Sequence, residues 1–120
     1  MTRRIVDHVV EGMSVNLDVV VTDEPGEGGA NHFYHIVNGD IPLAGLRFQK
    51  GALKEVGDVN GITNEALLAV VIDRLRGFQK GQFSCRENAL ALTHAETALM
   101  WLQARSRDRI RRNVEGTHAK

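Results

Sequence analysis

Residues 63–112 read TNEALLAVVIDRLRGFQKGQFSCRENALALTHAETALMWLQARSRDRIRR, and this stretch decides the fold. Its apolar residues recur with the period of an α-helix on either side of one glycine-containing break. Thr63 or Asn64 can cap a first helix, and Gly77 and Gly81 mark its end. One broad apolar stripe runs along this helix, formed by Leu67, Leu68, Val71, Ile72, Leu75 and Phe78.

A second, longer helix is predicted to start near Ser84 or Cys85 and to continue through Arg112 without a breaker. Because the connection is short, the two helices are expected to form an antiparallel hairpin beyond which the second helix projects. The apolar residues near the projecting end are Met100, Trp101, Leu102 and Ile110. They need a partner surface, which predicts self-association through the hairpins, most simply as a symmetric dimer.

The first sixty residues have the composition of strands and turns. β-Branched residues predict strands at residues 4–10 and 15–22, and the glycine-rich stretch 24–32 predicts a loop. Residues 32–37 and 41–51 are expected to pair as a hairpin through the turn Asn38-Gly39-Asp40, with a further turn at Val59-Asn60-Gly61.

Together these patterns predict an α+β fold. A small N-terminal antiparallel β-sheet, residues 1–62, precedes a long C-terminal α-helical hairpin, residues 63–120, within a single domain of residues 1–120.

The overall charge is balanced, with 15 basic and 15 acidic residues among 120. This balance excludes the bulk basicity of proteins that coat long nucleic acid, so any anion site must come from local clustering. A single cysteine, no signal-peptide pattern and no apolar run of bilayer length predict a soluble cytoplasmic protein without a membrane partner.

The strongest local signal is ARSRDRIRR, residues 104–112, in which five arginines surround Asp108. At about 100° per residue, Arg105, Arg109 and Arg112 share one helix face. One reading is a solvated helix end, where cations interact favourably with the helix dipole. The density of like charges instead favours an anion site, because neighbouring cations repel and the guanidinium fork fits phosphate oxygens.

Phe78 and Asn88 are the other candidate binding residues. Phe78 is either a core aromatic or a base-stacking surface, and Asn88 is either a capping residue or an amide contact. With the arginines they would provide the flat surface, polar amide and phosphate forks that a nucleotide requires.

The sequence lacks a credible catalytic or metal-binding set. His32 and His35 lie an odd number of residues apart, so on a strand they would be surface residues facing opposite ways. Cys85 has no histidine placed by sequence as its base and is interpreted as a small buried residue. Neither GxxxxGK[ST] nor GxGxxG occurs. We therefore expect no enzyme activity, no cofactor and no metal.

From Tyr34 onward the sequence resembles the phage-encoded Thoeris anti-defence sponge of the first type, a family that shares its helical hairpin with the phage anti-CBASS cyclic-dinucleotide sponge. The most distinctive segments are VNGITNEALL (59–68), FSCRENALAL (83–92) and VEGT (114–117). The resemblance implies dimers and a hexamer built as a trimer of dimers. It also implies sequestration, without degradation, of cyclic ADP-ribose isomers made by TIR-domain immune enzymes in the host bacterial cytoplasm.

The same resemblance implies a role for each candidate residue. Phe78 corresponds to the stacking aromatic, Asn88 to the amide contact, and Arg105 and Arg109 to the phosphate-binding pair. Cyclic trinucleotides or dinucleotides of the CBASS system are further ligands that the family suggests. The alternative hypothesis is a nucleic-acid-binding phage regulatory protein that lays the arginine-rich face on duplex phosphate.

Overall fold

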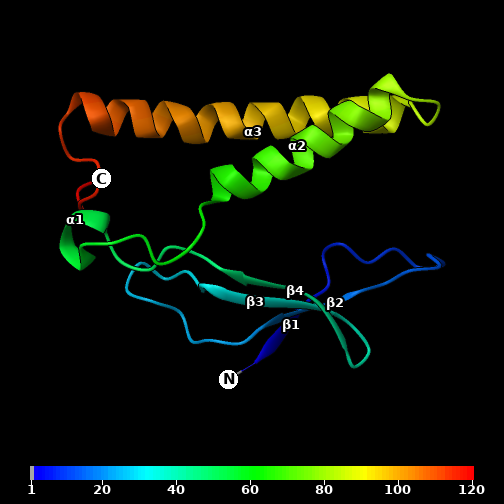
Figure 1. Cartoon of the computed structure of the whole chain (residues 1–120), viewed down its shortest axis with the longest axis horizontal. Coiled ribbons are helices and arrows are strands. Elements are labelled where there is room, and N and C mark those ends of the chain that lie inside the picture. The colour runs from blue at the N-terminus through cyan, green and yellow to red at the C-terminus, as the bar shows by residue number, and fades with distance from the viewer. Residues whose placement is uncertain (1) are drawn as a thin grey trace. The chain divides into compact units, whose positions relative to one another are not determined.

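The computed structural model describes residues 2–120 and has the predicted α+β architecture, with a four-stranded sheet followed by helices (Figure 1). Its contacts divide into two compact units. The sheet unit extends to Lys50 and includes Val59–Ile62, whereas the helical unit contains Gly51–Asp58 and Thr63–Lys120.

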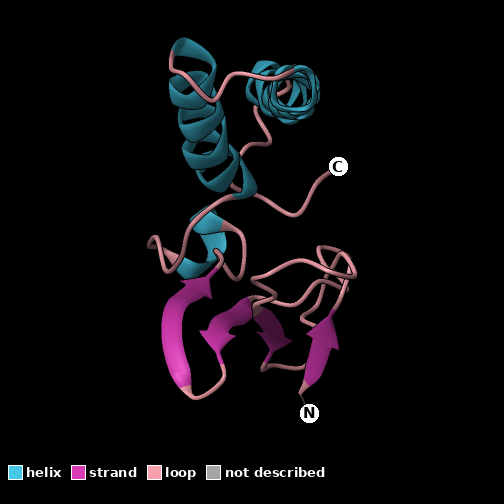
Figure 2. Ribbon diagram, turned by 90° about the vertical axis from the view of Figure 1, so that its right-hand side faces the viewer, coloured by secondary structure: helices cyan, strands magenta, loops and turns pink. Residues whose placement is uncertain are grey.

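The sheet is an antiparallel meander in which neighbouring strands in sequence are neighbours in space (Figure 2). Its strands are β1 (Arg3–Ile5), β2 (Asp18–Val21), β3 (Phe33–Asn38) and β4 (Ile41–Arg47). The predicted β3–β4 hairpin is confirmed, with Asn38 opposite Ile41 across the turn, but β4 ends at Arg47 and not at Gly51. A register shift at Ile36/Val37 places Pro42 opposite Val37.

The first two predicted strands were wrong in extent. β1 ends at Ile5, because the chain turns where the Val9 N–H donates to the Val6 carbonyl oxygen at 3.0 Å. β2 begins only at Asp18, opposite Val37 near the end of β3. Strand pairing, not β propensity, therefore sets the length of both strands.

The sheet unit is centred on Val21, whose side chain is fully buried. Nearby in this unit, the Tyr34 and Phe48 rings meet edge to face with centroids 5.5 Å apart. Phe48 also bridges Ile62 in parallel, and a Cβ at Gly61 would lie 2.3 Å from the Phe48 carbonyl carbon. Glycine is required at position 61 because the two backbone segments approach so closely.

The helical unit contains α1 (Leu53–Val56), which the sequence pattern did not predict, α2 (Asn64–Lys80) and α3 (Arg86–Arg111). Thr63 caps α2 as predicted, its side chain accepting a hydrogen bond from the Ala66 N–H at 3.1 Å. Gly77 does not end α2. The helix continues to Lys80 and ends at Gly81, since an isolated glycine costs only about 1 kcal/mol within a helix.

Cys85 caps α3, with its Sγ accepting a hydrogen bond from the Asn88 N–H at 3.4 Å. The expectation that Cys85 is buried was wrong: it is exposed, as a residue that follows a surface loop can be.

α2 and α3 run in opposite directions and converge at the loop that joins them, as the predicted antiparallel hairpin (Figure 1). Ile72 of α2 is buried at 2% exposure. Arg76 and Glu96 form an ion pair between the two helices at 2.8 Å. α3 has 26 residues and α2 has 17, so α3 projects beyond its neighbour as predicted. Met100, Trp101 and Ile110 are exposed, and Leu102 is half-buried.

Candidate ligand-binding site

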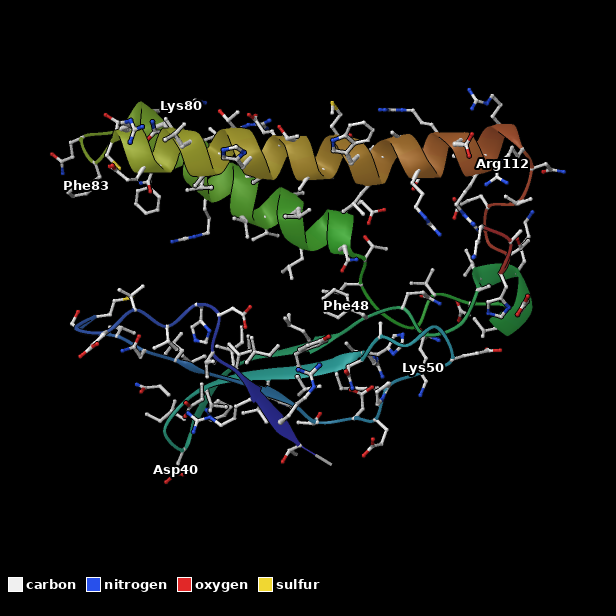
Figure 3. The ribbon with its side chains drawn as sticks, turned by 180° about the vertical axis from the view of Figure 1, so that it is seen from behind. Asp40, Phe48, Lys50, Lys80, Phe83 and Arg112 are labelled. Atoms are coloured by element: carbon white, nitrogen blue, oxygen red, sulfur yellow. The ribbon has the colours of Figure 1, made fainter. Side chains whose placement is uncertain are left out.

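The four candidate binding residues fall into two pairs, one at the loop end of the hairpin and one at the C-terminal end of α3. Phe78, in the last turn of α2, and Asn88, in the first turn of α3, lie at the loop end of the hairpin. Arg105 and Arg109 lie in the last turns of α3. At 1.5 Å per residue, Asn88 and Arg109 are separated by about 31 Å along the helix axis. Figure 3 marks the two ends, with Lys80 and Phe83 near the loop and Arg112 opposite. The structure of one chain does not bring the four together.

The loop end offers a partly exposed aromatic surface. Phe78 is 40% exposed, so it is not a core residue in this chain. The guanidinium carbon of Arg74 lies 5.5 Å from the centroid of the Phe78 ring, a cation–π distance. Asn88 is half-buried, one helical turn from the cap. An aromatic ring with an attached cation can accept a stacked base or another flat group.

At the opposite end of α3, Asp108 neutralises two of the five arginines. Arg111 donates to one carboxylate oxygen at 2.6 Å and Arg112 to the other at 2.9 Å. The hydrogen bond from Arg111, together with Arg112, holds the pKa of Asp108 below its ordinary value despite the opposing effect of desolvation. The prediction that Arg105, Arg109 and Arg112 present an anion site on one helix face is therefore corrected for Arg112, which is paired with Asp108 of the preceding turn.

Arg109 is buried, with only 4% of its surface exposed. Residues 113–119, here called the return segment, fold back over its guanidinium. One terminal nitrogen donates to the Ala119 carbonyl oxygen, and the other donates to those of Val114 at 3.0 Å and Thr117 at 2.7 Å. Nε lies 3.5 Å from a carboxylate oxygen of Glu115. Arg109 thus acts in this structure as an internal anchor for the chain after α3.

Arg105 and Arg107 remain exposed. Within residues 2–120, neither guanidinium has an ion-pair or hydrogen-bond partner. Of the two predicted phosphate-binding residues, Arg105 is therefore immediately available to an anion and Arg109 is not.

A separate polar cluster closes the loop between β2 and β3. The Asp23 carboxylate accepts hydrogen bonds from the backbone N–H groups of His32 at 3.0 Å and Phe33 at 3.2 Å. Burial acts to raise the pKa of Asp23, but these hydrogen bonds and one from Asn31 outweigh it and place that pKa below its ordinary value.

The expectation for His32 was wrong. It precedes β3, and its half-buried ring lies against Gly26, where a Cβ would be 2.8 Å from the ring. His35 is on β3 and exposed, as predicted. Across residues 2–120 no group of three His, Cys, Asp or Glu side chains could hold a metal ion. In the same part of the chain, no helix combines the length and apolarity needed to cross a membrane.

Sequence reasoning missed α1 and the return segment. The backbone N–H of Lys54 in α1 donates to the Gly116 carbonyl oxygen at 2.9 Å, and Glu55 pairs with His118 at 2.7 Å. Asn113 has φ 61° and Gly116 has φ 82°, and these two residues were the signals of a turn after α3, because asparagine and glycine tolerate this left-handed region.

A small antiparallel meander followed by an antiparallel helical hairpin with an arginine-rich second helix defines the class of protein. Residues 44–107 match the family model described as the Acb2/Tad1 hairpin domain. The chain therefore belongs to the Acb2/Tad1 hairpin family. It is 47% identical over 95 residues to "Thoeris anti-defense 1" of Bacillus phage SBSphiJ7, a match that covers 79% of this chain and 66% of that protein, just under two thirds of the relative's length. Arg109 and the return segment lie beyond the stretch matched by the family model.

Proposed function

We propose that the protein is a phage anti-defence sponge that binds cyclic ADP-ribose isomers and keeps them from the immune effector they activate. The main support is its family membership together with the 47% identity to a protein named for Thoeris anti-defence. TIR-domain enzymes of the infected bacterium would supply the ligand. The protein would act in the host cytoplasm, and cyclic oligonucleotides of the CBASS system are further candidate ligands.

The separation along α3 supports a site built from two chains. Arg105 lies too far from Phe78 and Asn88 for one small nucleotide to touch all three within a single chain. Two hairpins packed antiparallel would place the arginine end of each α3 against the loop end of the other. Such a dimer would form two equivalent sites, each with an aromatic, an amide and phosphate-binding arginines.

The exposed apolar residues of the hairpin support this assembly. Trp101 is 67% exposed and Ile110 is 63% exposed, which is costly for a hairpin surrounded only by water. Burying them between copies would stabilise a homodimer. Three dimers could then assemble as a hexamer.

The energetics of such a site suit a sponge. Competition with an immune effector calls for a dissociation constant of about 1 nM, or roughly −12 kcal/mol. A ligand of roughly 35 heavy atoms at about −0.3 kcal/mol per atom would contribute about −10 kcal/mol. An enclosed site between two chains approaches the required affinity because it adds desolvated, charge-assisted contacts.

Binding without turnover needs neither a general base directed at the ligand nor a metal-bound water. The proposed contacts from Phe78, Asn88 and Arg105 are stacking, amide and guanidinium contacts, which hold a cyclic nucleotide without attacking it. The bound nucleotide should therefore leave the protein chemically unchanged.

The test is a panel of cyclic ADP-ribose isomers and cyclic di- and trinucleotides, with the melting temperature measured for each. A selective rise for one or more cyclic ADP-ribose isomers, followed by recovery of the intact nucleotide on heating, is expected. No shift with any member would overturn the proposal, and recovery of a hydrolysed product would favour an enzyme.

The alternative of a nucleic-acid-binding regulator receives less support. Arg111 and Arg112 are paired with Asp108, and Arg109 is buried. Only Arg105 and Arg107 of the cluster remain for duplex phosphate, too few for the contacts that such proteins make. A salt-dependent gel shift with duplex DNA would revive this alternative.

A further inference from the structure

The return segment covers the guanidinium of Arg109, a residue that the family resemblance implies to be one of the phosphate-binding pair. Three hydrogen bonds join this guanidinium to backbone carbonyl oxygens of Val114, Thr117 and Ala119. At 4% exposure the side chain offers no surface on which a phosphate could sit. Its Nε is buried and makes no hydrogen bond, although the carboxylate of Glu115 lies 3.5 Å away. Arg109 and a ligand can meet only if the return segment moves.

The return segment is held at its other side by α1. The Gly116 carbonyl oxygen accepts from the Lys54 N–H at 2.9 Å, and His118 Nδ1 lies 2.7 Å from a carboxylate oxygen of Glu55. The residues of the Lys54–Gly116 hydrogen bond and of the His118–Glu55 pair are at least partly exposed, so water can replace both interactions. The contacts that hold the segment therefore differ from those that hold α2 to α3, so the segment can open without separating the hairpin.

We infer that the return segment is a latch that competes with an anionic ligand for Arg109. In the closed state the guanidinium is satisfied by neutral carbonyl oxygens. In the open state it donates to a pyrophosphate, whose charged oxygens accept stronger hydrogen bonds. The identity of the ligand rests on the proposed function, whereas the competition itself does not.

This competition would add selectivity to the site. A neutral nucleoside could stack on Phe78, but it could not replace the three carbonyl oxygens around Arg109. A pyrophosphate could replace them, because hydrogen bonds from Arg109 to its charged oxygens would offset the free energy lost when the latch opens. The apparent dissociation constant equals the intrinsic one divided by the open fraction, so a latch that is open about one tenth of the time weakens binding about tenfold.

Gly116→Ala provides a way to open the latch without touching Arg109. Gly116 has φ 82°, and a Cβ there would lie 3.0 Å from Lys54 Cγ, so alanine disfavours the closed segment on two counts. The matched control is Gly39→Ala in the β3–β4 turn, where φ is 59° and nothing lies within 4 Å of the added Cβ. A second variant, Glu55→Ala, removes the ion pair to His118 and leaves the backbone of the segment unchanged.

The first measurement needs no nucleotide. Phenylglyoxal, which modifies accessible guanidinium groups, is applied to the full chain and each arginine is quantified by peptide mass spectrometry. Arg109 should react at least about tenfold more slowly than Arg105 in the unmodified protein, since its guanidinium is hydrogen-bonded to the return segment and buried. Gly116→Ala should raise its rate about fivefold or more, Glu55→Ala by less, and Gly39→Ala not at all. Equal rates for Arg105 and Arg109 in the unmodified protein would overturn the latch.

The second measurement uses inorganic pyrophosphate and a cyclic ADP-ribose isomer as probes. Pyrophosphate should protect Arg109 of Gly116→Ala from phenylglyoxal, and calorimetry should give about five- to tenfold tighter binding of the isomer to Gly116→Ala. Weaker binding by a folded Gly116→Ala would overturn the latch and make the return segment a support for Arg109 instead. If pyrophosphate protects Arg109 but no isomer binds even the unmodified protein, the latch stands and the proposed function fails.

Discussion

Arg105 and Arg109 lie one helical turn apart on α3, yet Arg105 is exposed to solvent and Arg109 is buried beneath the return segment. Sequence spacing makes the two residues equivalent, because both occupy one helix face. Their surroundings make them different. Arg105 can bind an anion as it stands, whereas Arg109 must first give up three backbone acceptors.

Arg105→Ala is expected to weaken binding of a cyclic ADP-ribose isomer by about 1.5–3 kcal/mol, the usual contribution of a charge-assisted hydrogen bond. Arg107→Ala is the matched control, because Arg107 is also exposed but lies on another face of α3. Isothermal titration calorimetry measures both. Equal losses for the two variants would show that the effect is general charge and not a specific contact.

Phe78→Ala should weaken binding by about 1–3 kcal/mol, the range found for base–aromatic stacking, and Phe78→Trp should retain most of the affinity. The control is Phe83→Ala, which removes a more exposed ring, at 66%, from the nearby loop. Calorimetry with the same ligand gives both values. If Phe83→Ala proves the more damaging change, the aromatic contact has been assigned to the wrong residue.

Mixing two variants with weakened binding tests whether each site uses two chains. Phe78→Ala and Arg105→Ala are unfolded together, refolded as a mixture and titrated at a ligand concentration at which each alone is nearly empty. In a two-chain site, half of the dimers are mixed and one of their two sites is intact, so roughly one site in four should recover the original affinity. Recovery of none would mean that Phe78 and Arg105 do not meet across a dimer.

The lowered pKa of Asp23 predicts how the stability of the sheet unit changes in acid. Its pKa is lowered in the folded chain, so it contributes stability above its unfolded value of about 3.9, and this contribution is lost as the pH falls through the folded pKa. Asp23→Asn should be less stable than the original protein at pH 7, and the difference should shrink below about pH 4. Chemical denaturation at several pH values measures this difference in the free energy of unfolding. A difference that grows in acid would contradict the assignment.

Ile72→Ala should lower the free energy of unfolding of the helical unit by about 2–4 kcal/mol, because it leaves a cavity at the most buried position of α2. Val70→Ala, at a position that is 57% exposed, should cost less than about 1 kcal/mol if the chain is monomeric. Thermal unfolding followed by circular dichroism compares the two. A large loss for Val70→Ala would indicate that this face of α2 is covered in an assembly.

The sequence by itself determined the order and type of the main elements. Helical periodicity, the Thr63 cap and the Asn38-Gly39-Asp40 turn were sufficient because they are local signals, carried by neighbouring residues. Only the tertiary structure decided the lengths of β1 and β2, the exposure of Cys85 and the different surroundings of Arg105 and Arg109. Each of these depends on a partner brought in from elsewhere in the chain: a neighbouring strand, a loop or the return segment. Periodicity cannot reveal such partners, since burial and hydrogen bonding depend on long-range packing.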